Sequence, residues 1–163
     1  MTDFYQFLAD HKIEYERHDH PAVFTVAESD RLVPSLPGAK TKNLFLRDQK
    51  GKRHFLVVVG AHKRVNIKAL PEALGSSRLS FGSAGRLKKY LGVEPGAVTL
   101  LAIFNDPDHA VEVFMDKALW ASEAFNFHPL VNTSTLVISR KNIQRFIEST
   151  GHEIQIVDVP DQD

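Results

Sequence analysis

The sequence contains no cysteine among its 163 residues. This absence excludes a disulfide framework, a zinc site built from thiolates and a cysteine nucleophile. It is also typical of a reducing compartment, and we expect the protein in the cytoplasm. No apolar run approaches the roughly 20 residues that span a bilayer, and the first residues carry no signal-peptide pattern. We therefore expect no association with a membrane.

Several motifs that would define an active site are missing as well. No serine lies in a Gly-x-Ser-x-Gly elbow, and the chain has neither a Gly-x-x-x-x-Gly-Lys phosphate loop nor a Gly-x-Gly-x-x-Gly turn. Among eight histidines, His18 and His20 are two apart on one face of an expected strand. No His-x-x-x-His helix pattern accompanies them, so we expect neither a metal nor a cofactor.

The charges cancel overall but are unevenly distributed along the chain. Residues 40–89 hold 13 Lys and Arg against 2 Asp and Glu, whereas residues 1–39 hold 3 against 7 and residues 90–163 hold 4 against 11. A cationic middle favours a partner that presents phosphates at one place. The alternative is that folding mixes the three segments and cancels the asymmetry. The length and the composition, 43% hydrophobic and 25% charged, predict one globular domain over residues 1–163.

Hydrophobic periodicity and capping residues predict the local structure. Thr2 or Asp3 can cap the first helix, and Thr25 with Glu28 forms a capping box for the second, which Pro34 helps to end. Helices are expected at residues 3–12, 26–33, 66–74, 84–91, 116–120 and 140–150. Pro71 breaks the third helix or delays its start. Strands are expected at residues 13–20, 40–48, 55–59, 111–115, 124–129, 135–138 and 153–157, and residues 97–104 could form a strand or a short helix.

The order of these elements predicts the fold class. Strands alternate irregularly with short helices, and hairpin-length turns join several of them, including the turn at Gly51 between the second and third strands. This order favours an α+β fold with a mixed, mostly antiparallel sheet over a regular βαβ succession.

The entrance of the strand at residues 40–48 is the first candidate site. Lys40, Lys42 and Asn43 lie together at the start of a buried strand, which is a rigid place to hold a cation and an amide against a ligand. The simpler interpretation is a solvated lysine pair. His128 ends an apolar strand and could contact a ligand or serve only the structure. Gly96 belongs to a turn whose amides could face a ligand, although a helix C-cap followed by a turn explains it equally well.

Four segments in sequence resemble a known family. They are residues 20–26, 40–46, 91–99 and 127–133. In this order they resemble the YbaK/prolyl-tRNA-editing superfamily of aminoacyl-tRNA deacylases, and among these the free-standing PrdX/ProX type that removes alanine from mischarged tRNA-Pro. The resemblance covers essentially the whole chain. It implies a compact α+β domain with a barrel-like sheet flanked by short helices.

The resemblance also assigns roles to single residues. Lys42 matches an essential lysine that engages the backbone of the tRNA 3′ end, and Asn43 matches the asparagine beside it. Gly96 matches the first glycine of a Gly-x-x-x-Pro loop that holds the aminoacyl group, although Leu100 stands here in place of the proline. His128 matches a histidine that contacts the aminoacyl group.

Further residues complete the expected site. An aminoacyl ester is already activated, so its hydrolysis needs a positioned water and a stabilised oxyanion, with no metal or covalent intermediate. The Ala97 amide is a further candidate contact. We expect the pocket to be walled by Val23, Phe24, Val26 and Leu44, and tRNA to be contacted by Lys40, Arg86, Lys88 and Lys89.

Three functions therefore remain open. The first is a monomeric enzyme that deacylates Ala-tRNA-Pro in trans, with the acceptor end of tRNA as partner and a transient contact to prolyl-tRNA synthetase. The second is the same reaction on another mischarged tRNA, such as Cys-tRNA-Pro. The third is a non-catalytic module that binds aminoacyl-tRNA, which the departure at Leu100 would favour.

Overall fold

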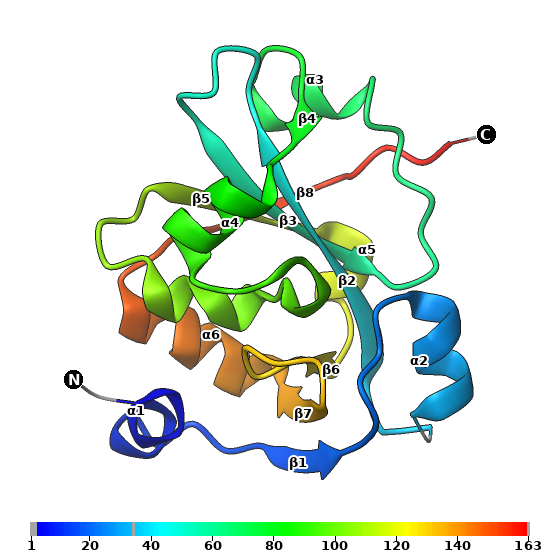
Figure 1. Ribbon diagram of the computed structural model, residues 1–163, viewed down its shortest axis with the longest axis vertical. Coiled ribbons are helices and arrows are strands. Elements are labelled where there is room, and N and C mark those ends of the chain that lie inside the picture. Colours follow the sequence, from blue (N-terminus) through cyan, green and yellow to red (C-terminus); the bar gives the residue numbers. More distant parts are fainter. Residues whose placement is uncertain (1–2, 34, 163) are drawn as a thin grey trace.

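Eight strands form one mixed sheet in the computed structural model, which describes residues 3–33 and 35–162 (Figure 1). The strand order is β1-β7-β6-β2-β3-β5-β8, with β4 added to β2. The strands are β1 (Glu16–Asp19), β2 (Ala39–Arg47), β3 (His54–Gly60), β4 (Ser80–Phe81), β5 (Val111–Asp116), β6 (Ala124–Phe127), β7 (Ser134–Ser139) and β8 (Ile154–Val157). Four pairings are antiparallel and three are parallel, so the predicted mixed, mostly antiparallel sheet is confirmed. The barrel-like sheet stays open, because β1 and β8 lie at its two ends.

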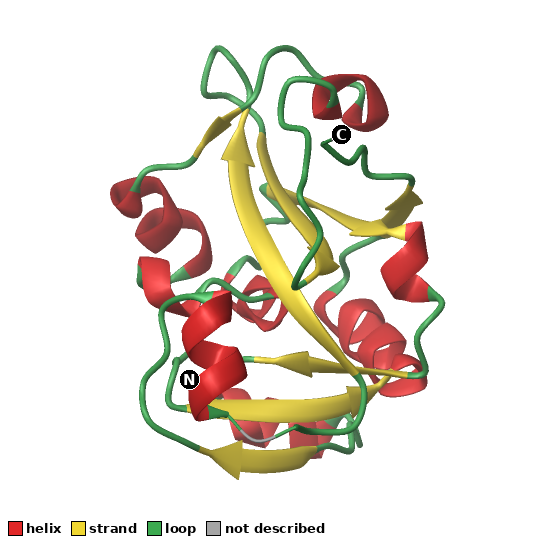
Figure 2. Cartoon of the chain, turned by 90° about the vertical axis from the view of Figure 1, so that its right-hand side faces the viewer, coloured by secondary structure: helices red, strands yellow, loops and turns green. Residues whose placement is uncertain are grey.

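Strand β2 connects the two halves of the sheet. Its first residues, Ala39 and Lys40, pair in parallel with β6, and its last, Leu46 and Arg47, pair with β4. From Thr41 onward the other side of β2 pairs with β3. Figure 2 shows the long β2 crossing from the lower group of strands to the upper group. This change of neighbours leaves the middle of one β2 edge without a strand partner in the described part of the chain.

Short helices cover the sheet, and most of them begin where the sequence predicts. They are α1 (Phe4–Asp10), α2 (Val26–Leu32), α3 (Leu70–Leu74), α4 (Ala84–Leu91), α5 (Lys117–Trp120) and α6 (Arg140–Thr150), with the 3-10 helices η1 (Pro95–Ala97) and η2 (Leu100–Asn105). The Thr25 side chain accepts a hydrogen bond from the Glu28 amide, which confirms the capping box. Ser83 and Ser139 cap α4 and α6 in the same way. None of the described helices is long and apolar enough to cross a membrane.

Some boundaries differ from the predictions. Helix α3 starts only at Leu70, because Pro71 is accommodated in its first turn, where the missing amide costs nothing. Residues 100–105 form a 3-10 helix, which settles the open choice between strand and helix. Strand β1 is shorter than the predicted 13–20 and begins at Glu16. The roles predicted for Thr2 and Pro34 lie outside the described residues.

Two apolar clusters pack on opposite faces of β2. Phe45 belongs to the larger cluster, which α1, α4, η2 and α6 cover, whereas Leu46 belongs to the smaller cluster beneath α3. Leu44 packs against the smaller cluster as well, as the two-residue period of a strand requires. The sheet is therefore buried on both sides at β2 and β3, which makes β2 a rigid support for polar groups at its open edge.

Candidate active site

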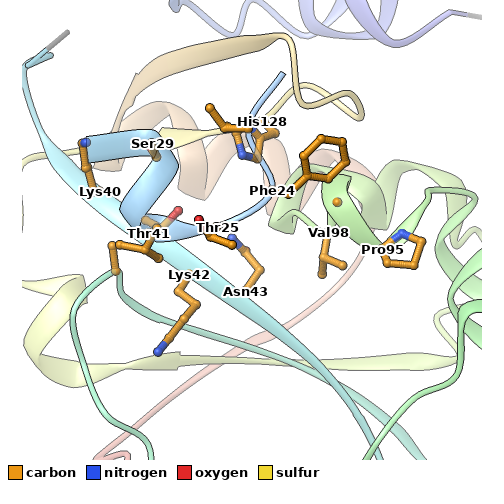
Figure 3. A pocket seen from close by; sticks show the side chains of 14 residues that line it. Phe24, Thr25, Ser29, Lys40, Thr41, Lys42, Asn43, Pro95, Val98 and His128 are labelled. Carbon is orange, nitrogen blue, oxygen red and sulfur yellow. The ribbon is translucent and has the colours of Figure 1, made fainter. Parts of the chain in front are cut away.

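A cavity of about 310 Å³ opens at the unpaired edge of β2 (Figure 3). This volume is at the lower end of the range for small-molecule sites. Helix α2 and the chain before it form one wall, the segment around η1 forms another, and His128 enters from the end of β6. Figure 3 shows His128 and Phe24 on one side of the cavity and Lys42 extending away from them. A ligand in this cavity would meet a cation at one end and an imidazole at the other.

Lys42 supplies a positive charge that no carboxylate in the described residues neutralises. Its Nζ donates a hydrogen bond to the Lys63 carbonyl over 2.6 Å and forms no ion pair with any of those residues. Partial burial lowers the pKa of Lys42, because desolvation disfavours the ammonium form. A half-buried ammonium without a counter-ion is costly, which is typical of a group that awaits an anionic ligand.

The Lys63 segment that holds Lys42 is itself anchored. Lys63 Nζ forms ion pairs with Asp116 over 2.8 Å and with Asp161 over 3.6 Å. Asp116 is buried and also accepts a hydrogen bond from the Val159 amide. The carbonyl that receives the Lys42 hydrogen bond is therefore fixed by the end of β5 and by the C-terminal segment.

The backbone of Leu100, the residue that stands in place of the family's loop proline, orients the Asn43 side chain. Its Oδ1 accepts a hydrogen bond from the Leu100 amide over 2.9 Å. A backbone N–H can only donate, so this contact fixes which end of the amide is oxygen and leaves Nδ2 as the free donor. Nδ2 has no partner among the residues that the structure describes. A proline at position 100 could not make this contact, so Leu100 gives the chain a means of positioning Asn43.

His128 presents a lone pair at the other end of the cavity. Its Nδ1 lies 3.1 Å from the Ser134 carbonyl oxygen. Because a carbonyl only accepts, Nδ1 carries the proton and Nε2 is an acceptor. Burial lowers the pKa of His128, and the neighbouring His20 lowers it further. The neutral ring can therefore accept a hydrogen bond from a ligand amine or from water.

Gly96 and Phe24 are in close contact at the mouth of the cavity. A Cβ atom on Gly96 would lie 2.7 Å from Phe24 Cδ1, so only glycine allows the ring to approach this segment. Phe24 remains 68% exposed. The Ala97 amide donates to the Glu94 carbonyl over 2.9 Å, which commits it to η1 and removes it as a ligand contact.

The apolar walls are only partly as the sequence predicted. Val23, Phe24 and Val26 line the cavity. Leu44 does not line it, because Leu44 faces the smaller apolar cluster on the opposite side of β2. Lys40 lines the cavity, but Asp30 neutralises it with an ion pair of 2.9 Å.

The cations proposed on α4 lie away from the cavity lining. Arg86 donates to the Gly51 carbonyl over 2.9 Å and to His54 Nε2 at the same distance, so it braces the β2–β3 turn. Lys88 pairs with Glu94 over 3.4 Å, and Lys89 lies 5.2 Å from the centre of the Tyr90 ring. Only a ligand that extends beyond the cavity could reach them.

Several lining residues were absent from the sequence prediction. They are Thr25, Ser29, Thr41, Ala61, Pro95 and Val98. Helical spacing could have identified Ser29, which lies three residues after Val26 on the same face of α2. Thr25, Thr41, Pro95 and Val98 lie within the segments that carry the family resemblance, whereas nothing in the sequence points to Ala61. No three His, Asp or Glu side chains in the described residues converge on a metal site.

The fold and the site define a small α+β protein whose cavity is lined by an ammonium group, an imidazole and short apolar side chains. Residues 20–146 match the family of the aminoacyl-tRNA editing domain. The chain is 34% identical over 148 residues to the prolyl-tRNA editing protein ProX of Acetoanaerobium sticklandii, a match covering 91% of this chain and 90% of the relative. It is 37% identical over 152 residues to prolyl-tRNA synthetase associated domain-containing protein 1 of Bos taurus, covering 91% and 88%.

Solved structures share the fold. A hypothetical protein of known crystal structure aligns with a TM-score of 0.72 at 20% identity, covering 94% of this chain and 97% of the other. A candidate trans-editing enzyme for prolyl tRNA synthetase aligns with a TM-score of 0.65 at 14% identity, covering 98% and 99%. At these identities the likeness concerns the fold alone.

The chain therefore belongs to the aminoacyl-tRNA editing domain family. The protein is an aminoacyl-tRNA deacylase, a hydrolase of the ester that links an amino acid to tRNA.

Proposed function

We propose that the protein hydrolyses mischarged tRNA-Pro in trans and that Ala-tRNA-Pro is its substrate. The names of the two sequence relatives, which refer to prolyl-tRNA editing and to prolyl-tRNA synthetase, support the tRNA. The observation that carries the proposal is the cavity with an unneutralised ammonium at one end and a neutral imidazole at the other. Residues 1–163 act in this proposal as one monomeric editing domain in the cytoplasm, with at most a transient contact to prolyl-tRNA synthetase.

The roles follow from the hydrogen-bonding capacity of each group. Lys42 binds a phosphate of the CCA end, which supplies the counter-ion that the protein itself does not provide. Nδ2 of Asn43 donates a hydrogen bond to the ester or the ribose. Nε2 of His128 accepts a hydrogen bond from the α-ammonium group of alanine. Arg86, Lys88 and Lys89 remain candidates for contacts farther along the acceptor stem.

These contacts place the ester for attack by water. The water oxygen adds to the carbonyl carbon, the bond to the ribose oxygen breaks, and the ribose oxygen takes up a proton as free alanine leaves. Holding the ester in place supplies the entropic part of the rate enhancement, and donors near the carbonyl oxygen stabilise the charge that develops there.

The walls of the cavity set the size of the amino acid. Val23, Val26 and Val98 line it with short branched side chains. An apolar pocket distinguishes one methylene by only ~1–3 kcal/mol, whereas steric overlap excludes larger groups more strongly. We therefore place the upper limit near alanine or serine, and tRNA identity must supply the remaining specificity.

A panel of charged tRNAs tests the proposal. The purified protein is incubated with tRNA-Pro carrying labelled alanine, serine, cysteine or proline, and with Ala-tRNA-Ala. We expect alanine to be released fastest from tRNA-Pro and Pro-tRNA-Pro to survive. Hydrolysis of Pro-tRNA-Pro at the rate of Ala-tRNA-Pro would refute the size limit. Release of cysteine faster than alanine would make Cys-tRNA-Pro the substrate instead of Ala-tRNA-Pro. Protection of every ester would refute the catalytic function.

A further inference from the structure

An exposed aromatic ring and a second hollow lie directly beside the cavity. Phe24 is 68% exposed, more than any other large hydrophobic side chain in the described part of the chain. The same ring lines both the cavity and a neighbouring hollow of about 220 Å³. Gly96 is also shared by the two. The hollow therefore adjoins the cavity in which the ester is expected, with Phe24 and Gly96 between them.

The backbone that carries the Phe24 ring is held in place. The Phe24 amide donates to Glu28 over 3.3 Å, and the preceding residue, Val23, exchanges two hydrogen bonds with Asn132. One edge of the ring lies so close to Gly96 that a Cβ atom there would be 2.7 Å from Phe24 Cδ1. An anchored backbone reduces the conformational entropy that is lost when a planar ligand stacks on the ring.

Another part of the lining of the hollow, at Leu130 and Val131, is apolar and strained. Leu130 has a φ of 70°, a left-handed conformation that is uncommon for a leucine. Val131 beside it is 48% exposed. Strain and exposed apolar surface at one loop are typical of a segment that is held ready for a ligand.

The established activity identifies what this ligand must be. Every aminoacyl ester on tRNA is carried by the ribose of a terminal adenosine, and the base is attached to that same ribose. When the ester occupies the cavity, the adenine must therefore lie one sugar away from it. The hollow beside Phe24 adjoins the cavity, because Phe24 and Gly96 line both, so it is the neighbouring space in which that base could lie.

We propose that Phe24 is the stacking platform for the terminal adenine and that the hollow formed with Leu130, Val131 and Asn132 is its subsite. Bases stack on exposed aromatic side chains in many single-stranded nucleic-acid sites, independently of sequence. This role differs from that of a wall for the amino acid, which the sequence suggested for Phe24. The proposal rests on the deacylase activity and on the cavity as the site of the ester, but not on the identity of the amino acid.

A fluorescent base tests the proposal directly. A short CCA oligonucleotide is prepared with 2-aminopurine in place of its terminal adenine, whose fluorescence falls on stacking. We expect quenching on titration with the wild-type protein, little quenching with Phe24→Leu and restored quenching with Phe24→Trp. The matched control is Phe81→Leu, which removes another exposed ring, on β4, and should quench as the wild type does.

Kinetics with a charged tRNA provide the second measurement. The loss of one stacking contact should raise the KM of Phe24→Leu roughly 5- to 150-fold, with a much smaller change in kcat. Phe24 is exposed, so the variant should melt at the wild-type temperature. Wild-type quenching or wild-type KM in Phe24→Leu would overturn the proposal. A changed preference between alanine and proline at unchanged KM would instead make Phe24 a wall for the amino acid.

The two proposals can fail separately. All tRNAs end in the same adenosine, so a panel that reveals a different amino acid or tRNA leaves the quenching result intact. Conversely, Phe24-independent quenching would overturn the adenine subsite while Ala-tRNA-Pro remained the preferred substrate.

Discussion

Replacing Lys42 by methionine removes the ammonium group and keeps a side chain of similar length. In the wild type this ammonium has one partner, the Lys63 carbonyl at 2.6 Å, and burial lowers its pKa. The lost hydrogen bond destabilises the variant, whereas removal of a half-buried cation stabilises it. We expect the two effects to offset one another to within about 1 kcal/mol in the free energy of unfolding.

The effect of Lys42→Met on activity should be much larger. A hydrogen bond from a charged group is worth about 1.5–3 kcal/mol, which corresponds to roughly a 10- to 150-fold fall in kcat/KM. The matched control is Lys40→Met in the same cavity. Asp30 already neutralises Lys40 over 2.9 Å, so this variant should lose at most about fivefold.

Deacylation of Ala-tRNA-Pro and chemical denaturation measure the two quantities on the same preparations. The pH dependence adds a third test. The folded-state pKa of Lys42 is lowered, so the wild type should gain stability relative to Lys42→Met as pH rises through that pKa toward about 10.4. Full activity in Lys42→Met would refute the phosphate contact. If Lys42→Met lost several kcal/mol in the free energy of unfolding while Lys40→Met folded as the wild type does, Lys42 would be a structural residue.

Two further predictions concern other polar contacts. The Asn43→Asp variant should still accept a hydrogen bond from the Leu100 amide and keep the wild-type melting temperature. It loses the free Nδ2 donor and adds a negative charge near the expected phosphates, so kcat/KM should fall at least about tenfold. Wild-type kinetics would contradict this prediction. Asp106 is buried 2.9 Å from His152 Nε2. Burial raises the pKa of Asp106, but hydrogen bonds from His152 and two amides outweigh this effect and hold the pKa below its ordinary value. The contribution of Asp106 to stability is complete above about pH 4 and lost as pH falls below it. Asp106→Asn should therefore cost about 1–3 kcal/mol at pH 7 and show a flatter acid denaturation profile, and equal profiles would refute the assignment.

Local sequence signals predicted the elements of the fold well. Helices α4 and α6 begin at the predicted positions, directly after the caps Ser83 and Ser139, and end at glycines with positive φ, because both signals depend only on neighbouring residues. The β2–β3 hairpin formed around Gly51 for the same reason. Pairings between distant strands could not be predicted in this way. The change of β2 from β6 to β4, which opens the cavity, depends on contacts more than 30 residues apart.

Predictions of which residues line the cavity were most accurate for residues with polar or charged side chains. Lys42, Asn43 and His128 line one cavity, as the resemblance implied. Leu44 was misplaced because alternation along a strand gives two faces without saying which one is open. The role of Arg86 could not be foreseen either, since its partners, the Gly51 carbonyl and His54, are more than 30 residues away.

The distribution of charge shows why the site could not be predicted from the sequence alone. Carboxylates outside the cationic stretch neutralise four of its cations, in the pairs Lys40–Asp30, Arg53–Glu112, Lys63–Asp116 and Lys88–Glu94. Folding therefore brings carboxylates from both flanking segments to four of the 13 cations, so the alternative interpretation of the sequence holds only in part. The local excess of charge therefore indicates the site less well than the ion pairs that each cation forms, or does not form, in the folded chain. Lys42 is half-buried at a cavity with only a carbonyl as partner, and this position, which the sequence does not show, is why we propose it as the cation that binds a phosphate.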